Sequence, residues 1–323
     1  MNPFQFDTAS QVSDNSSAQE IQETGMVLNQ YYEEIKIMFP DEVKVFIRDH
    51  QEGDYTLLDV RQPGEYEETR LPGAKLVPLP QLADSYETLD ASRPIIVYCQ
   101  VGGRSRMATQ LLMGLGFRDV FHMMGGIQAW EEQTASGPRE FYLNFIRGDE
   151  SPDKIIRMAY HMEEGLRKFH EAIHARTTDA SLAALLIGLV KAEESHKKML
   201  VALYESLEHD AAPDGVSRIT DLPAKLEAGL MEGGIDFDEF MKQNEPFLND
   251  VSGYLDLAMM IETQALDLYL RMADESTNER AKQVLFRIGN EEKAHLAMLG
   301  RYLDGIGELA GNGSPLTDSS GGI

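Results

Sequence analysis

Two triplets of residues with the chemistry of metal ligands stand out in the chain. Each triplet holds two glutamates and a histidine, namely Glu163, Glu193 and His196 in the first and Glu262, Glu292 and His295 in the second. In each, the glutamates are 30 residues apart, the histidine follows three residues later, and all three positions repeat at an offset of 99 residues. A single Glu-x-x-His in an acidic helix is usually a solvated face. Two of them in register, each with an upstream glutamate, indicate a dinuclear metal site instead.

The spacing predicts two helical hairpins. The midpoints between the paired glutamates fall at Thr178 and Thr277, within polar runs that suit helix ends. At a rise of 1.5 Å per residue, each glutamate then lies about 22 Å from its turn, so the carboxylates of a hairpin reach the same height. Apolar residues recur at helical spacing beside them. Burying four carboxylates without cations would cost several kcal/mol each, and two divalent ions would neutralise all four.

These hairpins define a predicted four-helix bundle. We expect helices at about residues 152–175, 181–208, 245–274 and 279–305, with residues 209–244 as a long crossover connection. His161, His170 and His174 share the first helix with Glu163 and are expected either to contact the ligands as outer partners or to have surface or packing roles. Glu164, Glu194 and Glu291 adjoin the ligands but point about 100° away from them on a 3.6-residue helix. Tyr269 is expected either to hydrogen-bond near the site or to fill the core, and Lys197 and Lys293 are expected in solvent.

Residues 152–303 resemble the rubrerythrin-like branch of the ferritin superfamily. The resemblance rests on the segment from Met162 to His170, with Glu163 as its ligand, and on Glu262 followed by Tyr269. It implies two iron ions per chain, with manganese as an alternative, in a site that reacts with peroxide or dioxygen. Two departures concern electron entry: Ala265 stands where that branch has an additional glutamate, and the chain has one cysteine instead of a four-cysteine iron site.

The single cysteine marks a second chemical centre. Cys99 follows the β-branched run at residues 95–98 and precedes Gly102, Gly103 and Arg104. Ligands of parallel sheets gather at the carboxyl ends of strands, and two glycines allow the backbone N–H groups to form an anion-binding nest. The helix N-terminus and Arg104 add positive potential, which favours a thiolate or persulfide over a buried, inert cysteine.

The surrounding domain alternates short strands and helices. We expect strands at residues 55–60, 75–78, 95–98 and 119–123, with helices at residues 40–49, within 61–71, at 104–115 and from 125 to 132. Such alternation predicts an α/β domain with a parallel sheet covered on both faces. The predicted organisation is a disordered tail (1–25), the α/β domain (26–135), a linker (136–151), the all-α bundle (152–305) and a second disordered tail (306–323).

The loop after Cys99 resembles that of rhodanese sulfurtransferases. Four residues separate Cys99 from Arg104, one fewer than in cysteine phosphatases, and the resemblance extends over about residues 41–133. It implies Cys99 as nucleophile and sulfur carrier, Arg104 as its catalytic partner, and a cradle of backbone amides for the terminal sulfur. The implied substrate-binding residues are Gln100, Val101, Gly102, Gly103 and Ser105. Asp59 and Arg61 are expected either to support the site or to form a surface salt bridge, and Trp130 to pack in the core.

Composition limits the partners. The chain of 323 residues has a formal net charge of −25, which argues against a nucleic-acid or anionic-membrane partner. It has no apolar run long enough to span a membrane and no secretory signal in its N-terminal residues, and its lone cysteine fits a reducing cytoplasm. We expect a cytoplasmic homodimer.

Three hypotheses combine the two centres. In the first, Cys99 takes sulfur from thiosulfate or a small persulfide, and the dinuclear site reduces peroxide or dioxygen, with the persulfide replacing the missing four-cysteine site as electron source. In the second, the bundle binds or buffers iron while the sulfurtransferase domain acts independently. In the third, the bundle is a degenerate dimerisation scaffold.

Overall fold

The structure, a computed structural model, describes residues 35–138, 149–208, 219–220, 231 and 235–311, apart from the side chains of residues 207–208 and 304–311. The chain divides into two compact units, Met1–Lys36 and Ile37–Ile323, and nearly all described residues belong to the second. The first predicted tail and most of the predicted crossover lie outside the described residues. Among the residues that are described, no helix is both long and apolar enough to cross a membrane.

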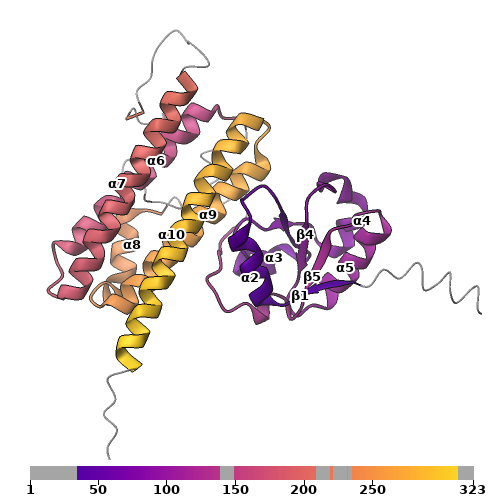
Figure 1. Cartoon of the computed structure of the whole chain (residues 1–323), viewed down its shortest axis with the longest axis horizontal. Helices are drawn as coiled ribbons and strands as arrows, with labels where there is room; N and C mark the ends of the chain where they lie inside the picture. Colours follow the sequence, from indigo (N-terminus) through magenta and orange to yellow (C-terminus); the bar gives the residue numbers. More distant parts are fainter. Residues whose placement is uncertain (1–34, 139–148, 209–218, 221–230, 232–234, 312–323) are drawn as a thin grey trace, which may run out of the picture. The chain divides into compact units, whose positions relative to one another are not determined.

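A five-stranded sheet forms the α/β part of the chain, in the order β1-β5-β4-β2-β3 (Figure 1). The strands are β1 (Lys36–Met38), β2 (Thr56–Asp59), β3 (Lys75–Leu76), β4 (Ile95–Tyr98) and β5 (Val120–Met123). The pairs β2–β3, β2–β4 and β4–β5 are parallel. The parallel α/β fold predicted from the sequence is therefore confirmed, and β4, flanked by β2 and β5, is its middle strand.

Alternation along β4 divides the core of this domain into two apolar clusters. Ile95 and Val97 pack with the residues of α5 (Gly103–Gly114), whereas Ile96 and Tyr98 pack with those of α2 (Pro40–Asp49) and α3 (Pro63–Glu68). Successive side chains of a strand point to opposite faces, so a strand covered on both sides reads as the continuous apolar run seen here. The same packing fixes the end of β4, where Cys99 follows.

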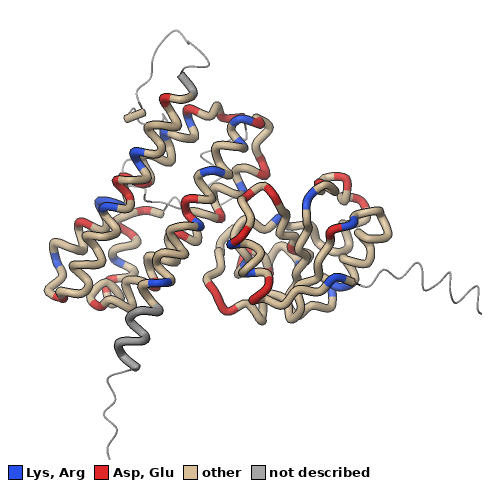
Figure 2. Tube along the Cα trace, in the orientation of Figure 1, with Lys and Arg blue, Asp and Glu red and all other residues tan. Residues whose placement is uncertain are grey.

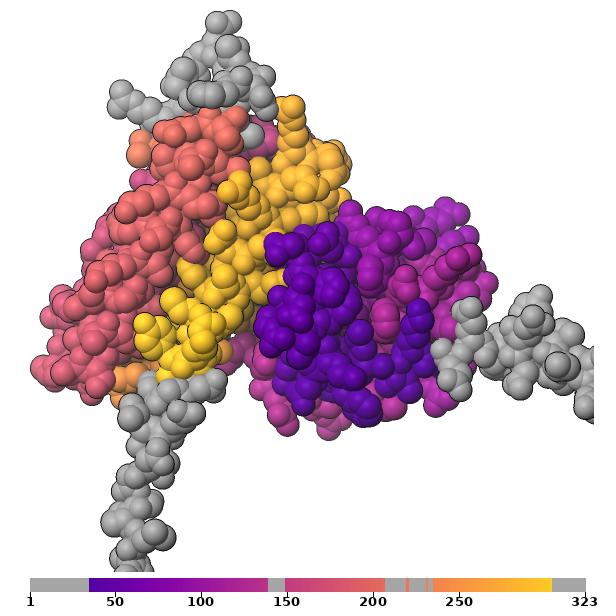
Figure 3. Space-filling model, in the orientation of Figure 1, coloured from indigo at the N-terminus to yellow at the C-terminus, as the bar shows by residue number. Residues whose placement is uncertain are grey.

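Four long helices make up the all-α part. They are α6 (Pro152–His174), α7 (Ala180–Glu208), α9 (Val251–Glu275) and α10 (Glu279–Gly311). Helix α6 packs on α7 and α9 on α10, and further contacts join α6 to α10 and α7 to α9; Figure 3 shows the α9–α10 pair in orange and yellow. Asp179 accepts hydrogen bonds from the first turn of α7, and Asn278 does so for α10. These polar caps explain why the turns fall where the repeat predicts them.

Several predicted boundaries were wrong. Helix α9 begins at Val251 and not at residue 245, because Pro246 lies in a 3₁₀ turn (Glu245–Phe247) and Asp250 caps the helix by accepting from the Gly253 N–H group. A short helix α8 (Phe237–Asn244) precedes that turn. Helix α10 extends to Gly311, past the predicted end at residue 305.

Two further corrections concern the sheet domain. The predicted helix at residues 125–132 is a single 3₁₀ turn, Gly126–Ala129, because Gly125 and Gly126 both have positive φ. Strand β1 and the segment η1 (Leu79–Gln81), α4 (Leu82–Ser85) and η2 (Tyr86–Thr88) were not predicted.

Candidate active site and metal centre

Cys99 occupies the carboxyl end of β4, directly before the loop into α5. Its side chain is buried, and its Sγ atom accepts the Gly102 N–H group at 3.1 Å and lies 3.6 Å from Ser105 Oγ. Burial raises the pKa of the Cys99 thiol, but hydrogen bonds from Ser105 and from the backbone N–H groups of Gly102 and Val101 outweigh it and hold the pKa below its usual value. The loop therefore stabilises a thiolate, the nucleophilic form of cysteine.

Two glycines give this loop its shape. Gly102 has φ +105°, in the left-handed region, and it directs its N–H group to the sulfur. Gly126 approaches the backbone so closely that a Cβ atom there would lie 2.2 Å from the Cys99 carbonyl oxygen. Ile127 and Gln128 then donate to the carbonyl oxygens of Cys99 and Gln100 at 2.8 and 3.1 Å. The glycine pair at residues 125–126 thus fixes the backbone beneath the cysteine.

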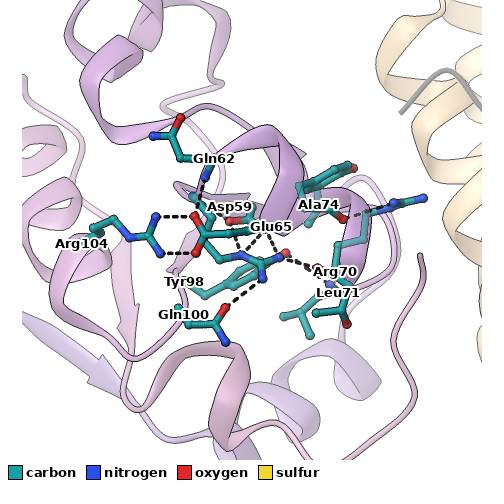
Figure 4. Close-up of polar contacts among 12 residues, drawn as sticks. Asp59, Gln62, Glu65, Arg70, Leu71, Ala74, Tyr98, Gln100 and Arg104 are labelled. Atoms are coloured by element: carbon teal, nitrogen blue, oxygen red, sulfur yellow. Dashed lines mark hydrogen bonds and ion pairs between the residues drawn. The ribbon is translucent and has the colours of Figure 1, made fainter. Parts of the chain in front are cut away.

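Arg104 is held by a carboxylate of the sheet domain. Its two terminal nitrogens donate to Glu65 at 2.7 and 2.6 Å, in the parallel geometry shown in Figure 4. This hydrogen bonding raises the pKa of Arg104 and lowers that of Glu65 to about 2. Glu65 is among the residues that carry the rhodanese resemblance, but sequence reasoning gave it no role and missed its pairing with Arg104.

Asp59 and Arg61 form a buried ion pair. Both side chains are fully buried, with Arg61 donating to both carboxylate oxygens of Asp59, at 3.0 and 2.6 Å. Arg61 also donates to the Gln100 side chain at 3.3 Å and to the Thr69 carbonyl oxygen. The surface salt bridge considered from the sequence is therefore wrong, and the pair contacts the Cys99 loop through Gln100.

The two remaining residues of the loop differ in their surroundings. Val101 is exposed, and Gly103 begins α5.

The six predicted metal ligands come together between the four long helices. All six side chains are buried, although they are charged or polar: Glu163, Glu193, His196, Glu262, Glu292 and His295. His196 Nδ1 lies 3.1 Å from Glu163 Oε1, and His295 Nδ1 lies 3.4 Å from Glu262 Oε1. The two imidazole rings stack with centroids 3.6 Å apart, which joins the two hairpins at one place.

The apolar core confirms that the ligands share one height. On each helix the ligands separate two groups of buried apolar residues. One apolar cluster includes residues 155–162 of α6, 200–204 of α7, 265–273 of α9 and 281–288 of α10. The other includes residues 166–173, 182–189, 254–261 and 299 of the same four helices. The six predicted ligands therefore lie in one polar layer between the two apolar clusters, as the hairpin geometry predicts.

The donor atoms fit divalent cations. Three groups each bring three ligand atoms within 4.8 Å of one another: Glu193, His196 and His295; Glu163, His196 and Glu292; and Glu262, Glu292 and His295. Both oxygens of Glu193 and of Glu292 are buried without a hydrogen-bond partner. Burial raises the pKa of Glu262 to about 8. Buried carboxylates that lack donors are costly, and cations are the natural complement of such a cluster.

Sequence reasoning underrated one neighbour of this cluster. His170 is buried, its Nδ1 atom contacts the hydroxyl group of Tyr254, and its Nε2 atom lies 3.4 Å from Glu193 Oε1. Tyr269 is fully buried, as expected. Lys197 is not in solvent but donates to Glu164 at 2.6 Å, and Lys293 donates to the carbonyl oxygens of Ile47 and His50.

Charged residues of both signs are interspersed over the part of the chain that the structure describes. Lys and Arg alternate with Asp and Glu along the helices and around the sheet (Figure 2). Several exposed charges form short ion pairs, such as Arg48 with Asp49 at 2.9 Å. The acidity therefore reads as solvated helix faces, in line with the expectation from composition.

The fold and the Cys99 loop define a class: parallel α/β domains that present a cysteine thiolate in a nest of backbone amides. A family model described as "Rhodanese-like domain" matches residues 42–133. The protein "Thiosulfate sulfurtransferase GlpE" of Coxiella burnetii is 32% identical over 78 residues, which cover 24% of this chain and 73% of that relative. The chain therefore belongs to the rhodanese-like family through this domain.

In other curated relatives the matched region is a smaller share of the relative's own length. "Rhodanese-like/PpiC domain-containing protein 12, chloroplastic" of Arabidopsis thaliana is 41% identical over 23% of this chain and 26% of its own length. "Uncharacterized protein YqhL" of Bacillus subtilis is 35% identical over 23% of this chain and 59% of its own length. The chain thus spans less than two thirds of either protein. A rhodanese-like domain protein from Staphylococcus aureus, whose structure is solved, is 25% identical over 32% of this chain and 98% of its own, with a TM-score of 0.30.

Proposed function

We propose that the chain is a sulfurtransferase in which Cys99 carries the sulfur. The Cys99 thiolate attacks the outer sulfur of thiosulfate, the S–S bond of thiosulfate breaks, and sulfite leaves with the electron pair. The product is a Cys99 persulfide, whose terminal sulfur passes to a nucleophilic acceptor such as cyanide, returning the bond electrons to Cys99. The observation that carries this proposal is the Cys99 Sγ atom, 3.1 Å from the Gly102 N–H group at the end of β4. A small persulfide is the alternative donor.

A thiosulfate:cyanide assay tests this function. We expect thiocyanate formation by the full chain, and a mass increase of one sulfur atom after incubation with thiosulfate alone. Cys99→Ser should lose both, because a hydroxyl group is a far weaker nucleophile than a thiolate. Met107→Ala is the matched control, since Met107 is an exposed residue of α5. Thiocyanate formation by the Cys99→Ser variant at the rate of the parent chain would contradict the proposal.

We also propose that the four long helices hold a dinuclear metal centre, with iron as the favoured metal and manganese as the alternative. The six buried glutamates and histidines would hold the ions. The carboxylate oxygens of Glu193 and Glu292 accept no hydrogen bond, although Glu193 Oε1 lies 3.4 Å from His170 Nε2. Iron bound there would supply the redox chemistry that reduces peroxide or dioxygen. The support is the ligand geometry, together with the resemblance to the rubrerythrin-like branch.

Cobalt(II) titration of the metal-free chain tests this centre, because its d–d absorption reports ligand number and geometry. We expect saturation at two ions per chain and its loss in a Glu193→Ala/Glu292→Ala variant, while a Glu194→Ala/Glu291→Ala variant retains it. Saturation unchanged by the first variant would refute the site. Iron loading beyond two ions per chain would instead favour an iron-buffering bundle beside an independent sulfurtransferase. The homodimer, the cytoplasmic location and the coupling of the two reactions stay predictions.

A further inference from the structure

One buried histidine of the sheet domain takes no part in the motifs described so far. His122 lies on β5, the neighbour of β4, and its side chain is 2% exposed. Its Nδ1 atom lies 3.0 Å from Ser105 Oγ, and a Cβ atom added to Gly102 would lie 3.3 Å from His122 Cε1. The imidazole therefore packs against the loop that holds Cys99, on the side of Ser105.

The single hydroxyl proton of Ser105 has three acceptors within reach. These are Cys99 Sγ at 3.6 Å, the Gly102 carbonyl oxygen at 3.1 Å and His122 Nδ1 at 3.0 Å. If Nδ1 carried no proton, it would accept the hydroxyl proton at the shortest distance and leave the sulfur without it. If Nδ1 carries the proton, it donates to Ser105 Oγ, and the hydroxyl proton is available to the sulfur. The tautomer of His122 thus decides which group Ser105 serves.

We propose that His122 is a positioning residue for sulfur transfer: its imidazole donates from Nδ1 to Ser105 Oγ and so directs the Ser105 hydroxyl proton to Cys99 Sγ. A negative charge on Sγ selects this arrangement, because a hydrogen bond to a charged acceptor is stronger than one to a neutral carbonyl oxygen. The inference rests on the proposed sulfurtransferase function and deepens it.

The charges around His122 agree with a neutral ring. Burial, and to a smaller extent the nearby Arg106 guanidinium, lower the pKa of His122 below its usual value. Arg104, the other cation of this loop, is paired with Glu65. A neutral imidazole has one N–H group, which this proposal assigns to Nδ1.

The reaction sequence decides when this hydrogen bond acts. The negative charge is on Sγ before sulfur is taken up, and in the persulfide it moves to the terminal sulfur. The charge returns to Sγ when the acceptor removes that sulfur. Ser105 and His122 therefore stabilise the thiolate at the start and at the end of the cycle, and they contribute least to the persulfide. Their loss should lower the rate at neutral pH and leave the high-pH plateau within a few-fold, because the thiolate forms there without them.

Alkylation by iodoacetamide measures the thiol pKa directly, since Cys99 is the only cysteine of the chain. We expect His122→Leu to raise that pKa by about one unit, the size of a lost hydrogen bond to a charged group. His122→Asn retains an N–H donor and should remain close to the parent chain. Ser105→Ala should raise the pKa, and adding His122→Leu to it should cause no further shift.

Three outcomes would overturn the proposal. One is an unchanged thiol pKa in a folded His122→Leu chain, and another is a full additional shift in the Ser105→Ala background. The third does not use His122→Leu, and so applies even if that variant does not fold. It is an Nε2–H tautomer of His122 in ¹⁵N-histidine NMR spectra of the parent chain, assigned by the signal lost in His122→Asn. None of these measurements uses a sulfur donor, so failure of the sulfurtransferase assay would be distinguished from failure of this inference.

Discussion

The carboxylate of Glu65 stabilises the folded chain most when it is ionised. Its pKa is lowered to about 2 by Arg104, so the ion pair stabilises the folded chain fully above the unfolded pKa of about 4.5 and loses that contribution as the pH falls toward 2. Glu65→Gln should therefore cost about 1 kcal/mol at pH 7, and the difference from the parent chain should disappear near pH 2.

Urea unfolding followed by tryptophan fluorescence measures this effect, because the single tryptophan, Trp130, belongs to the sheet domain. Glu68→Gln is the matched control, since Glu68 is an exposed residue of the same helix. A stability difference that stayed constant between pH 7 and pH 2.5 would show that Glu65 acts through packing and not through its charge.

The contact between His170 and Tyr254 bears on the neighbouring Glu193. Removing the hydroxyl group in Tyr254→Phe leaves the buried Nδ1 atom of His170 without that partner, which frees the imidazole to move away from Glu193. Outer groups that orient metal ligands typically change affinity by 10–100-fold. We expect Tyr254→Phe to weaken cobalt(II) binding by about tenfold in an equilibrium titration.

Tyr269→Phe supplies the comparison on the same helix. Its hydroxyl group lies 3.8 Å from Met162 Sδ. If the loss in Tyr254→Phe comes from the contact with His170, cobalt(II) affinity of Tyr269→Phe should stay within about twofold of the parent chain. Equal losses in the two variants would mean that tyrosine packing, and not the histidine contact, supports the site.

At the scale of elements, the cap of α9 carries a definite share of helix stability. The Asp250 carboxylate accepts the Gly253 N–H group at 2.9 Å, satisfying one donor of the first turn. Asp250→Ala should lower the free energy of unfolding by about 1 kcal/mol. In the metal-free chain, the ellipticity at 222 nm should then be lost at a lower temperature. The control Asp256→Ala removes an exposed carboxylate one and a half turns into the same helix. A smaller loss than in that control would place the helix start elsewhere.

The elements that could be predicted from the sequence are those whose signals repeat. The hairpins follow from two equal spacings and from caps at Asp179 and Asn278, so the convergence of the six glutamate and histidine side chains could be predicted without coordinates. The parallel sheet follows from the apolar run of β4 and the glycines after Cys99. The start of α9 could not be predicted from the sequence. A proline-containing 3₁₀ turn followed by a capped helix gives the same pattern of apolar residues as one continuous helix.

The contacts that sequence reasoning missed are those between distant single residues. Glu65 pairs with Arg104 across 39 positions, and His170 meets Tyr254 across 84. Neither contact produces a local periodicity, since each depends on how two elements pack. Asp59 and Arg61 are close in sequence, yet their spacing alone does not distinguish a buried pair from a surface one. Their burial depends on how the rest of the domain packs around them.

At the scale of the whole second unit, one buried ion pair links distant parts of the chain. Asp267 of α9 accepts from Arg70 at 2.7 Å, from Arg271 at 2.7 Å and from the Gly73 N–H group at 3.1 Å. Arg70 and Asp267 are fully buried. Asp267→Ala would leave two guanidinium groups without this carboxylate in a buried setting, which typically costs 3–5 kcal/mol.

We expect Asp267→Ala to shift the unfolding of both the sheet and the helices, because the carboxylate binds a residue of each. Trp130 fluorescence reports the first and ellipticity at 222 nm the second, so both midpoints in urea should fall together. Asp274→Ala is the control, since its partner Lys75 is at the surface and such pairs contribute 0–1 kcal/mol. A shift in Asp267→Ala no larger than in Asp274→Ala would show that water reaches the two arginines, and that the sheet and the bundle are stabilised independently.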